Sequence, residues 1–203
     1  MKTIRKYKTK KEEIKAKRNN AKMFPIYKMF SWDLLFFYST QYLFYTTTKG
    51  LTPGEVLKVE AFYPLFIIIM QLPAAICADL LGRKRSLVLG NLIMALYIFL
   101  LIILPGFMGI FIANIVYAFG YSLKGIQETN ILYDSTATKG GEGLYPKING
   151  KGATAYYILD GIASLAAGYL FVINQYLPMI CCLVITVIST IIAINFKDIY
   201  TNK

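Results

Sequence analysis

The sequence predicts an all-α membrane protein: a bundle of six transmembrane helices with both ends of the chain in the cytoplasm. Among its 203 residues, 56% are hydrophobic and only 16% are charged, whereas soluble domains have about 25% charged residues. The apolar residues form runs of the roughly 20 residues that a helix needs to cross the hydrocarbon core of a bilayer. No soluble domain remains between these runs to bind nucleic acid, so the net charge of +11 needs another explanation.

Six apolar runs can be followed along the chain, and they divide it into three parts. A basic cytoplasmic tail covers residues 1–26, the transmembrane bundle covers 27–196, and a short cytoplasmic end covers 197–203. The expected helices cover, in order, residues 27–47, 56–81, 86–104, 107–133, 148–173 and 177–196.

The distribution of cations predicts the orientation of the bundle. The N-terminal segment holds 11 of the 22 Lys and Arg residues, two loops on the same predicted side hold three each, and the C-terminal end holds two. The opposite side has only Lys49 and Lys58. Cationic loops stay in the cytoplasm during insertion. We therefore expect a multi-pass protein of the cell membrane, with the lipid bilayer as its partner and no nucleic acid. The four cationic segments are residues 1–28, 83–85, 139–151 and 197–203.

Charged residues inside the expected spans are the first candidates for function. A charge at the bilayer centre costs about 2.5–3.5 kcal/mol on insertion scales, so such residues should face an interior or a water-filled cavity. Lys124 and Glu128 are four positions apart and share one helix face. Either they neutralise each other, or they line an aqueous cavity with Asp33 and Asp160 that binds substrate or carries protons. Asp160 has no cation near it in sequence.

Enzymatic chemistry has little support in the composition. The chain has no histidine, and its three cysteines lie in apolar stretches. A zinc site or a histidine-based triad is therefore not expected, and neither is a metal or a cofactor. The carboxylates of the spans are candidates for proton coupling.

Residues 75–87, A-I-C-A-D-L-L-G-R-K-R-S-L, fall at the connection between the second and third expected helices. They resemble motif A of the major facilitator superfamily, G-x-L-A-D-R-x-G-R-K-x-x-L. Ala75, Cys77 and Leu80 stand where the family has glycine, leucine and arginine. The matching residues are Ala78, Asp79, Gly82, Arg83, Lys84 and Leu87.

A second segment, residues 125–135, resembles the end of the fourth helix in bacterial members of this superfamily. The resemblance implies that Arg83 pairs with Asp134, and that Asp79 caps a helix of the other half of the protein. With Gly82 and Lys84, these residues would form a gating motif. Such a pair can close the cytoplasmic side in one state and release it in another.

Members of this superfamily have two six-helix halves, each a 3+3 inverted repeat, with substrate bound between the halves. The expected spans correspond to the N-terminal half. The resemblance therefore implies secondary active transport of a small-molecule substrate by alternating access. The chain would act with a separately encoded second half or as a homodimer. The alternatives are a truncated fragment and a non-transporting six-span accessory membrane protein.

Efflux of drug-like or amphipathic compounds is the expected form of transport, because the first span is rich in aromatic side chains. The same side chains could instead pack against other helices or face lipid. They are Phe36, Phe37, Tyr38, Tyr42, Phe44 and Tyr45.

The predicted orientation can be tested with single cysteines in a chain that lacks its native cysteines. Because Lys49 and Lys84 lie on opposite predicted sides, Lys49→Cys should react with a membrane-impermeant maleimide added to intact cells. Lys84→Cys should react only after the membrane is permeabilised. Labelling of both positions from the same side would contradict the predicted topology.

Overall fold

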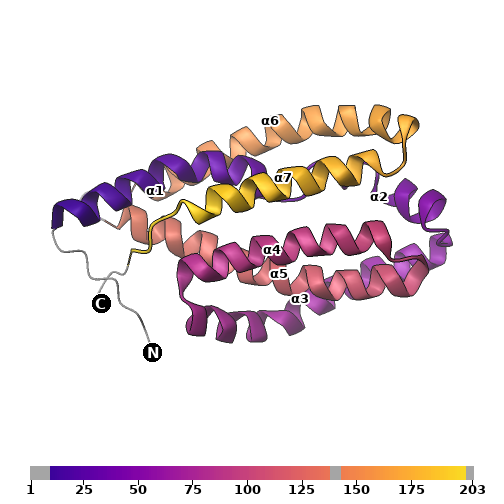
Figure 1. The fold of residues 1–203 in the computed structure, drawn as a ribbon, viewed down its shortest axis with the longest axis horizontal. Helices are drawn as coiled ribbons and strands as arrows, with labels where there is room; N and C mark the ends of the chain where they lie inside the picture. Colours follow the sequence, from indigo (N-terminus) through magenta and orange to yellow (C-terminus); the bar gives the residue numbers. More distant parts are fainter. Residues whose placement is uncertain (1–9, 138–142, 200–203) are drawn as a thin grey trace.

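The computed structural model describes residues 10–137 and 143–199, and every regular element in these two ranges is helical. The helices lie side by side in an elongated bundle (Figure 1). In chain order they are α1 (Lys10–Ser31), α2 (Gln41–Leu43), the π-helical turn η1 (Phe44–Thr48), α3 (Pro53–Leu81), α4 (Arg83–Ile103), α5 (Gly106–Thr136), α6 (Leu144–Ile173) and α7 (Leu177–Ile194).

Five of these helices, α3 to α7, are long and apolar enough to cross a membrane. They correspond to the second to sixth expected spans, with ends that differ by a few residues. The largest extension is at the start of α6, which begins at Leu144 rather than at residue 148. A helical, multi-pass membrane protein is therefore confirmed at the level of helix length and composition.

The first expected span, residues 27–47, is wrong as a continuous helix. Helix α1 begins at Lys10, inside the predicted tail, and ends at Ser31. A non-helical segment, residues 32–40, then leads into α2 and η1. The Asp33 carboxylate accepts a hydrogen bond from the backbone N–H of Leu34, and such local bonds compete with helix formation. Phe36 has a φ of +68°, outside the helical region.

The boundaries predicted at residues 26 and 197 do not separate the bundle from its ends. Ala16, Asn20 and Phe24 on the first half of α1 are buried in the bundle. Near the C-terminus, the backbone of Lys197 exchanges two hydrogen bonds with the Asn20 side chain, of 2.8 and 2.9 Å. The packed structure thus includes both flanks of residues 27–196. Residues 1–9 and 200–203 lie outside the described chain.

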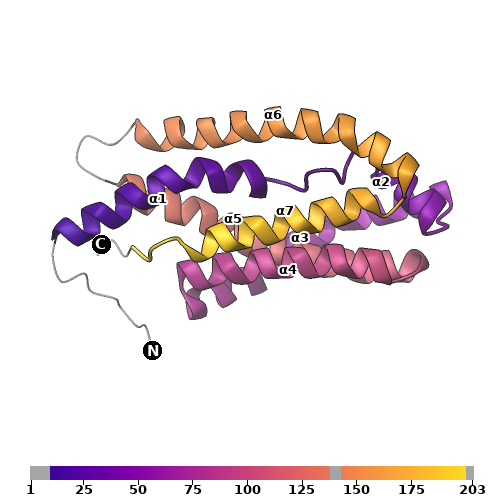
Figure 2. The same ribbon diagram turned by 45° about the horizontal axis from the view of Figure 1, so that its top comes forward.

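The helices pack as two groups of three. Helix α5 packs against α3 and α4, while α1 packs against α6 and α7. Contacts of α4 with α7 and of α1 with α5 join the groups, whose arrangement can be followed in Figure 2. Large side chains fill the largest buried cluster, which includes Phe37, Tyr45, Tyr97, Ile98 and Tyr117.

The two ends of the bundle differ in charge. Figure 1 shows the start of α1 and the segment that follows α7 at the end of the bundle where α3 meets α4 and α6 begins. We call this the basic end, because Arg83, Lys84, Arg85 and the first half of α1 lie there. At the opposite end, the Lys49 ammonium donates to the carbonyls of Ile102 and Leu104, over 2.8 and 2.9 Å. These two bonds satisfy carbonyls at the end of α4. Partial burial lowers the pKa of Lys49.

Close packing of α4 and α5 depends on glycine. A Cβ on Gly90 would lie 2.8 Å from the backbone nitrogen of Lys124, and a Cβ on Gly120 would lie 2.8 Å from Cγ2 of Ile93. Small residues let helix backbones approach in this way in membrane proteins. Gly125, also on α5, has open space around it.

Gly90→Ala should destabilise the bundle by about 1–3 kcal/mol, because the new methyl group meets a backbone that cannot move aside easily. Gly125→Ala is the matched control. It should leave stability unchanged or raise it by less than about 1 kcal/mol, since alanine favours helix and meets nothing there. Unfolding of the purified proteins in detergent checks both. Equal stability of the two variants would argue against the close crossing.

Candidate functional site

The candidate functional site lies at the end of α1, where a buried lysine replaces a missing helical hydrogen bond. Lys124 on α5 is 4% exposed, and its ammonium donates to the backbone carbonyl of Ser31. In a continuous helix this carbonyl would bond to the N–H of Leu35. The Lys124 nitrogen also lies 3.9 Å from Oε1 of Glu128. The buried charge is therefore satisfied in part by the carbonyl at which α1 ends.

Glu128 connects this lysine to a network across four helices. Its Oε1 accepts hydrogen bonds from the hydroxyl groups of Tyr27 (2.9 Å) and Ser31 (3.0 Å). The Tyr27 hydroxyl in turn accepts a bond of 2.9 Å from the amide of Asn91 on α4. Ser189 on α7 donates to the other end of Asn91, over 3.2 Å. The network gives each buried polar group a partner, as an apolar environment requires.

A second polar group surrounds Asp33, inside the non-helical segment. The hydroxyl of Tyr38 donates to Oδ1 of Asp33 over 2.9 Å. Tyr38 and Tyr63 both lie close to the hydroxyl of Tyr117, with O–O distances of 3.4 and 3.3 Å. The Tyr121 ring stacks on that of Tyr117, with centroids 5.5 Å apart. Asp33 is thus linked through tyrosines to α3 and α5. Both hydrogen bonds to its half-buried carboxylate from described residues end on Oδ1.

Asp160 lies on α6, on the other flank of Asp33. It is half-buried, it interacts with the Tyr156 hydroxyl, and its charge interacts with that of Asp33. No ion pair to Asp160 occurs in the part of the chain that the structure describes. The four predicted interior residues thus form two kinds of site. Lys124 and Glu128 are paired with each other, whereas Asp33 and Asp160 form no ion pair with any residue that the structure describes.

Lys28 is a further buried cation, which the sequence analysis counted with the N-terminal cationic segment. Its ammonium donates to Oδ1 of Asn149 on α6, and it lies 3.7 Å from the centre of the Trp32 ring. Gly152 makes room for it, because a Cβ there would lie 2.9 Å from Cβ of Lys28. Its position within the first apolar run could have indicated burial, but nothing in the sequence indicated Asn149 as the partner.

The predicted gating residues lie at the basic end. Arg83 and the buried carboxylate of Asp134 are in contact, as the family resemblance implies. Gly82 joins α3 to α4 with a φ of +81°, a backbone conformation that favours glycine. The side chain of Asp79 is exposed, without an ion pair among the described residues. That these residues act as a gate stays a prediction.

Asp198 completes this cluster and was missed from the sequence. Its Oδ1 accepts a bond of 3.1 Å from the backbone N–H of Lys84, at the start of α4. A carboxylate is stabilised there because helix N-termini expose unpaired N–H groups. Asp198 and Arg83 line the same small pocket with Asn20. The C-terminal segment therefore packs against both α1 and the α3–α4 junction.

Comparison with family models, with curated proteins and with solved structures finds no match for this chain. The resemblance to the major facilitator superfamily therefore rests only on the residues quoted above. Within the described residues, no group of three metal-ligating side chains is brought together.

The Lys124–Glu128 pair can be tested by a double-mutant cycle. Glu128→Leu and Lys124→Met should each destabilise the protein by about 3–5 kcal/mol, because each leaves a buried charge without its partner. The double variant should lose less than the sum of the single losses. Unfolding in detergent measures all three. Small, additive losses would instead place the two charges in a hydrated cavity, where neither needs the other.

Proposed function

We propose that the chain is one six-helix half of a secondary active transporter, which moves small molecules by alternating access together with a second bundle. The observation that carries the proposal is the non-helical segment 32–40 with Asp33 in it. In a membrane, irregular backbone is tolerated only where it is buried in protein or lines a water-filled cavity. Interrupted helices of this kind form the substrate and ion sites of many transporters, near the middle of the membrane.

The packing of the helices supports a 3+3 inverted repeat. If the first span (α1 to η1) corresponds to α5, α3 to α6, and α4 to α7, then each observed packing pair has a counterpart. The pair α1–α6 corresponds to α5–α3, and α4–α5 corresponds to α7–α1. The pair α3–α4 likewise corresponds to α6–α7, while α4–α7 and α1–α5 map onto themselves.

The exposed faces of α3 and α6 support a second bundle. In the most apolar 18-residue stretches of α3 and α6, only 11% and 17% of the residues are buried, against 39–50% in those of α4, α5 and α7. Gly161 and Gly168 lie on α6 with open space around them, so a helix of another bundle could approach closely there. The second bundle is either a separate chain or a second copy of this one.

The residues near the break take different roles in this proposal. Lys124 and Glu128 hold the end of α1 in place. Asp33 and Asp160 offer carboxylates to the substrate or to protons. The tyrosines beside Asp33 present ring faces that attract cations, so amphipathic organic cations are the substrates that fit best, moved by efflux.

The cluster at the basic end acts as the gate in this proposal. Arg83 paired with Asp134 holds α4 against α5, and Asp198 holds the C-terminal segment to the start of α4 through Lys84. Separation of these contacts would let the second bundle rock against this one, while Asp79 meets a helix of that bundle. In the cell membrane, the basic end faces the cytoplasm, as cationic loops do.

Alternating access predicts that a position near Asp160 is reached by water from both sides of the membrane. Ser164, one turn from Asp160 and half-buried, is suited to this test. In a chain without native cysteines, Ser164→Cys should react with a charged, impermeant thiosulfonate in sealed vesicles of either orientation. The rate of modification, followed by mass, is the measurement.

Val184→Cys is the control, because Val184 lies on the exposed apolar face of α7 and should react from neither side. Reaction of Ser164→Cys from one side only would contradict alternating access and favour a non-transporting accessory protein. Absence of reaction from both sides would contradict a hydrated interior.

A further inference from the structure

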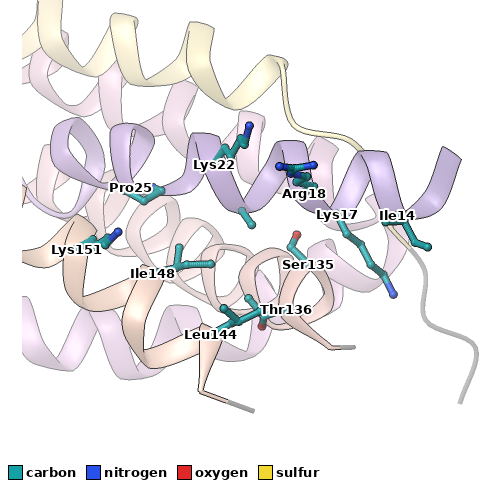
Figure 3. Close-up of a pocket in the computed structure, with 11 residues that line it drawn as sticks. Ile14, Lys17, Arg18, Lys22, Pro25, Ser135, Thr136, Leu144, Ile148 and Lys151 are labelled. Atoms are coloured by element: carbon teal, nitrogen blue, oxygen red, sulfur yellow. The ribbon is translucent and has the colours of Figure 1, made fainter. Parts of the chain in front are cut away.

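A groove at the basic end of the bundle is not part of the interior described above. It has a volume of about 490 Å³ and lies between the first half of α1, the end of α5 and the start of α6. Figure 3 shows α1 along one side, with Ser135 and Thr136 of α5 and Ile148 of α6 facing it. Three elements that are far apart in sequence therefore build its walls.

The lining combines two kinds of side chain that a phospholipid needs. The apolar residues of the lining are Ile14, Ala21, Pro25, Leu144 and Ile148. The lining also includes four cations, and none of the described lining residues is acidic. A soluble anion would interact with the cations but would gain nothing from the apolar residues. An anionic lipid can use both, with its phosphate on the cations and the start of an acyl chain on the apolar residues.

The four cations are not equally available. Lys17 is occupied, because it bonds to Glu13 (2.8 Å) and to the carbonyl of Ala137 (3.4 Å). Arg18 and Lys22 are exposed, lie one turn apart on α1, and so share one face of that helix. Lys151 stands across the groove on α6 and is also exposed. Arg18, Lys22 and Lys151 are therefore the exposed cations of the lining, and they lie on two helices.

Some apolar residues in and beside the groove are exposed, which indicates that the groove opens to lipid rather than to water. Ile14 and Leu144 are 55% and 44% exposed, and the neighbouring Ile26 on α1 is 54% exposed. Basic pockets between membrane helices bind anionic headgroups at the bilayer surface. We propose that this groove binds the headgroup and the first part of one acyl chain of an anionic phospholipid. The site does not depend on transport.

The proposal can be tested by native mass spectrometry of the full chain, released from detergent with a defined lipid. The probes are dioleoylphosphatidylglycerol, dioleoylphosphatidylcholine and inorganic phosphate. Phosphatidylglycerol should remain bound, while the zwitterionic lipid and the free phosphate should not. The triple variant Arg18→Gln/Lys22→Gln/Lys151→Gln should bind phosphatidylglycerol roughly a hundredfold more weakly, since each cation near a bilayer surface contributes about a factor of five to binding an anionic lipid.

The matched control removes three cations from the same helix but outside the groove: Lys10→Gln/Lys11→Gln/Lys15→Gln. This variant should keep its affinity to within about threefold, and Lys22→Arg/Lys151→Arg should keep it as well. An equal loss in the control variant would overturn the site, because binding would then follow net charge alone. Equal binding of phosphatidylcholine would overturn the preference for an anion, and equal binding of inorganic phosphate would overturn a lipid as the occupant.

Discussion

A buried ammonium group and the carbonyl that it bonds to determine the shape of this protein. Lys124 lies inside the bundle, where an unpaired charge is costly. Helix α1 stops at Ser31, and the Lys124 ammonium donates to the Ser31 carbonyl, which in a continuous helix would bond to the N–H of Leu35. The buried lysine and the interruption of the first span therefore meet at one carbonyl. Glu128, Tyr27 and Asn91 extend this contact, so that one charge on α5 fixes the positions of α1, α4 and α7.

The interruption also creates the chemistry that the proposed function uses. Because the chain leaves α1 at Ser31, Asp33 is carried by a loop among tyrosines and not by a helix face. Its carboxylate bonds to Tyr38, which lies close to Tyr117. At the basic end, the contact of Arg83 with Asp134 ties the other end of α5 to α4. Helix α5 thus contributes a charged residue to both regions, and a movement of α5 would change both together.

The sequence was sufficient to predict the features that depend on the residues of a single segment. Five spans were found because their apolar runs are long enough to form transmembrane helices, and the four-residue spacing of Lys124 and Glu128 was enough to predict that they meet. The break at 32–40 was not found, because its apolar and aromatic residues also suit a helix and because the lysine that bonds to the last carbonyl of α1 lies on α5. Long-range partners were missed for the same reason: 177 positions separate Asn20 from Lys197, and 114 separate Lys84 from Asp198. The contact of Arg83 with Asp134 was implied only by a family resemblance.

The central claim is that the first span is interrupted at membrane depth and reached by water. Hydrogen–deuterium exchange of the protein in lipid nanodiscs tests it most directly, because exchange reports both the loss of helical hydrogen bonds and access to solvent. The account predicts that amides of residues 33–39 exchange orders of magnitude faster than those of the buried part of α4, around Tyr97 and Ile98. Slow exchange throughout residues 27–47, equal to that of α4, would mean a continuous helix and would contradict the account.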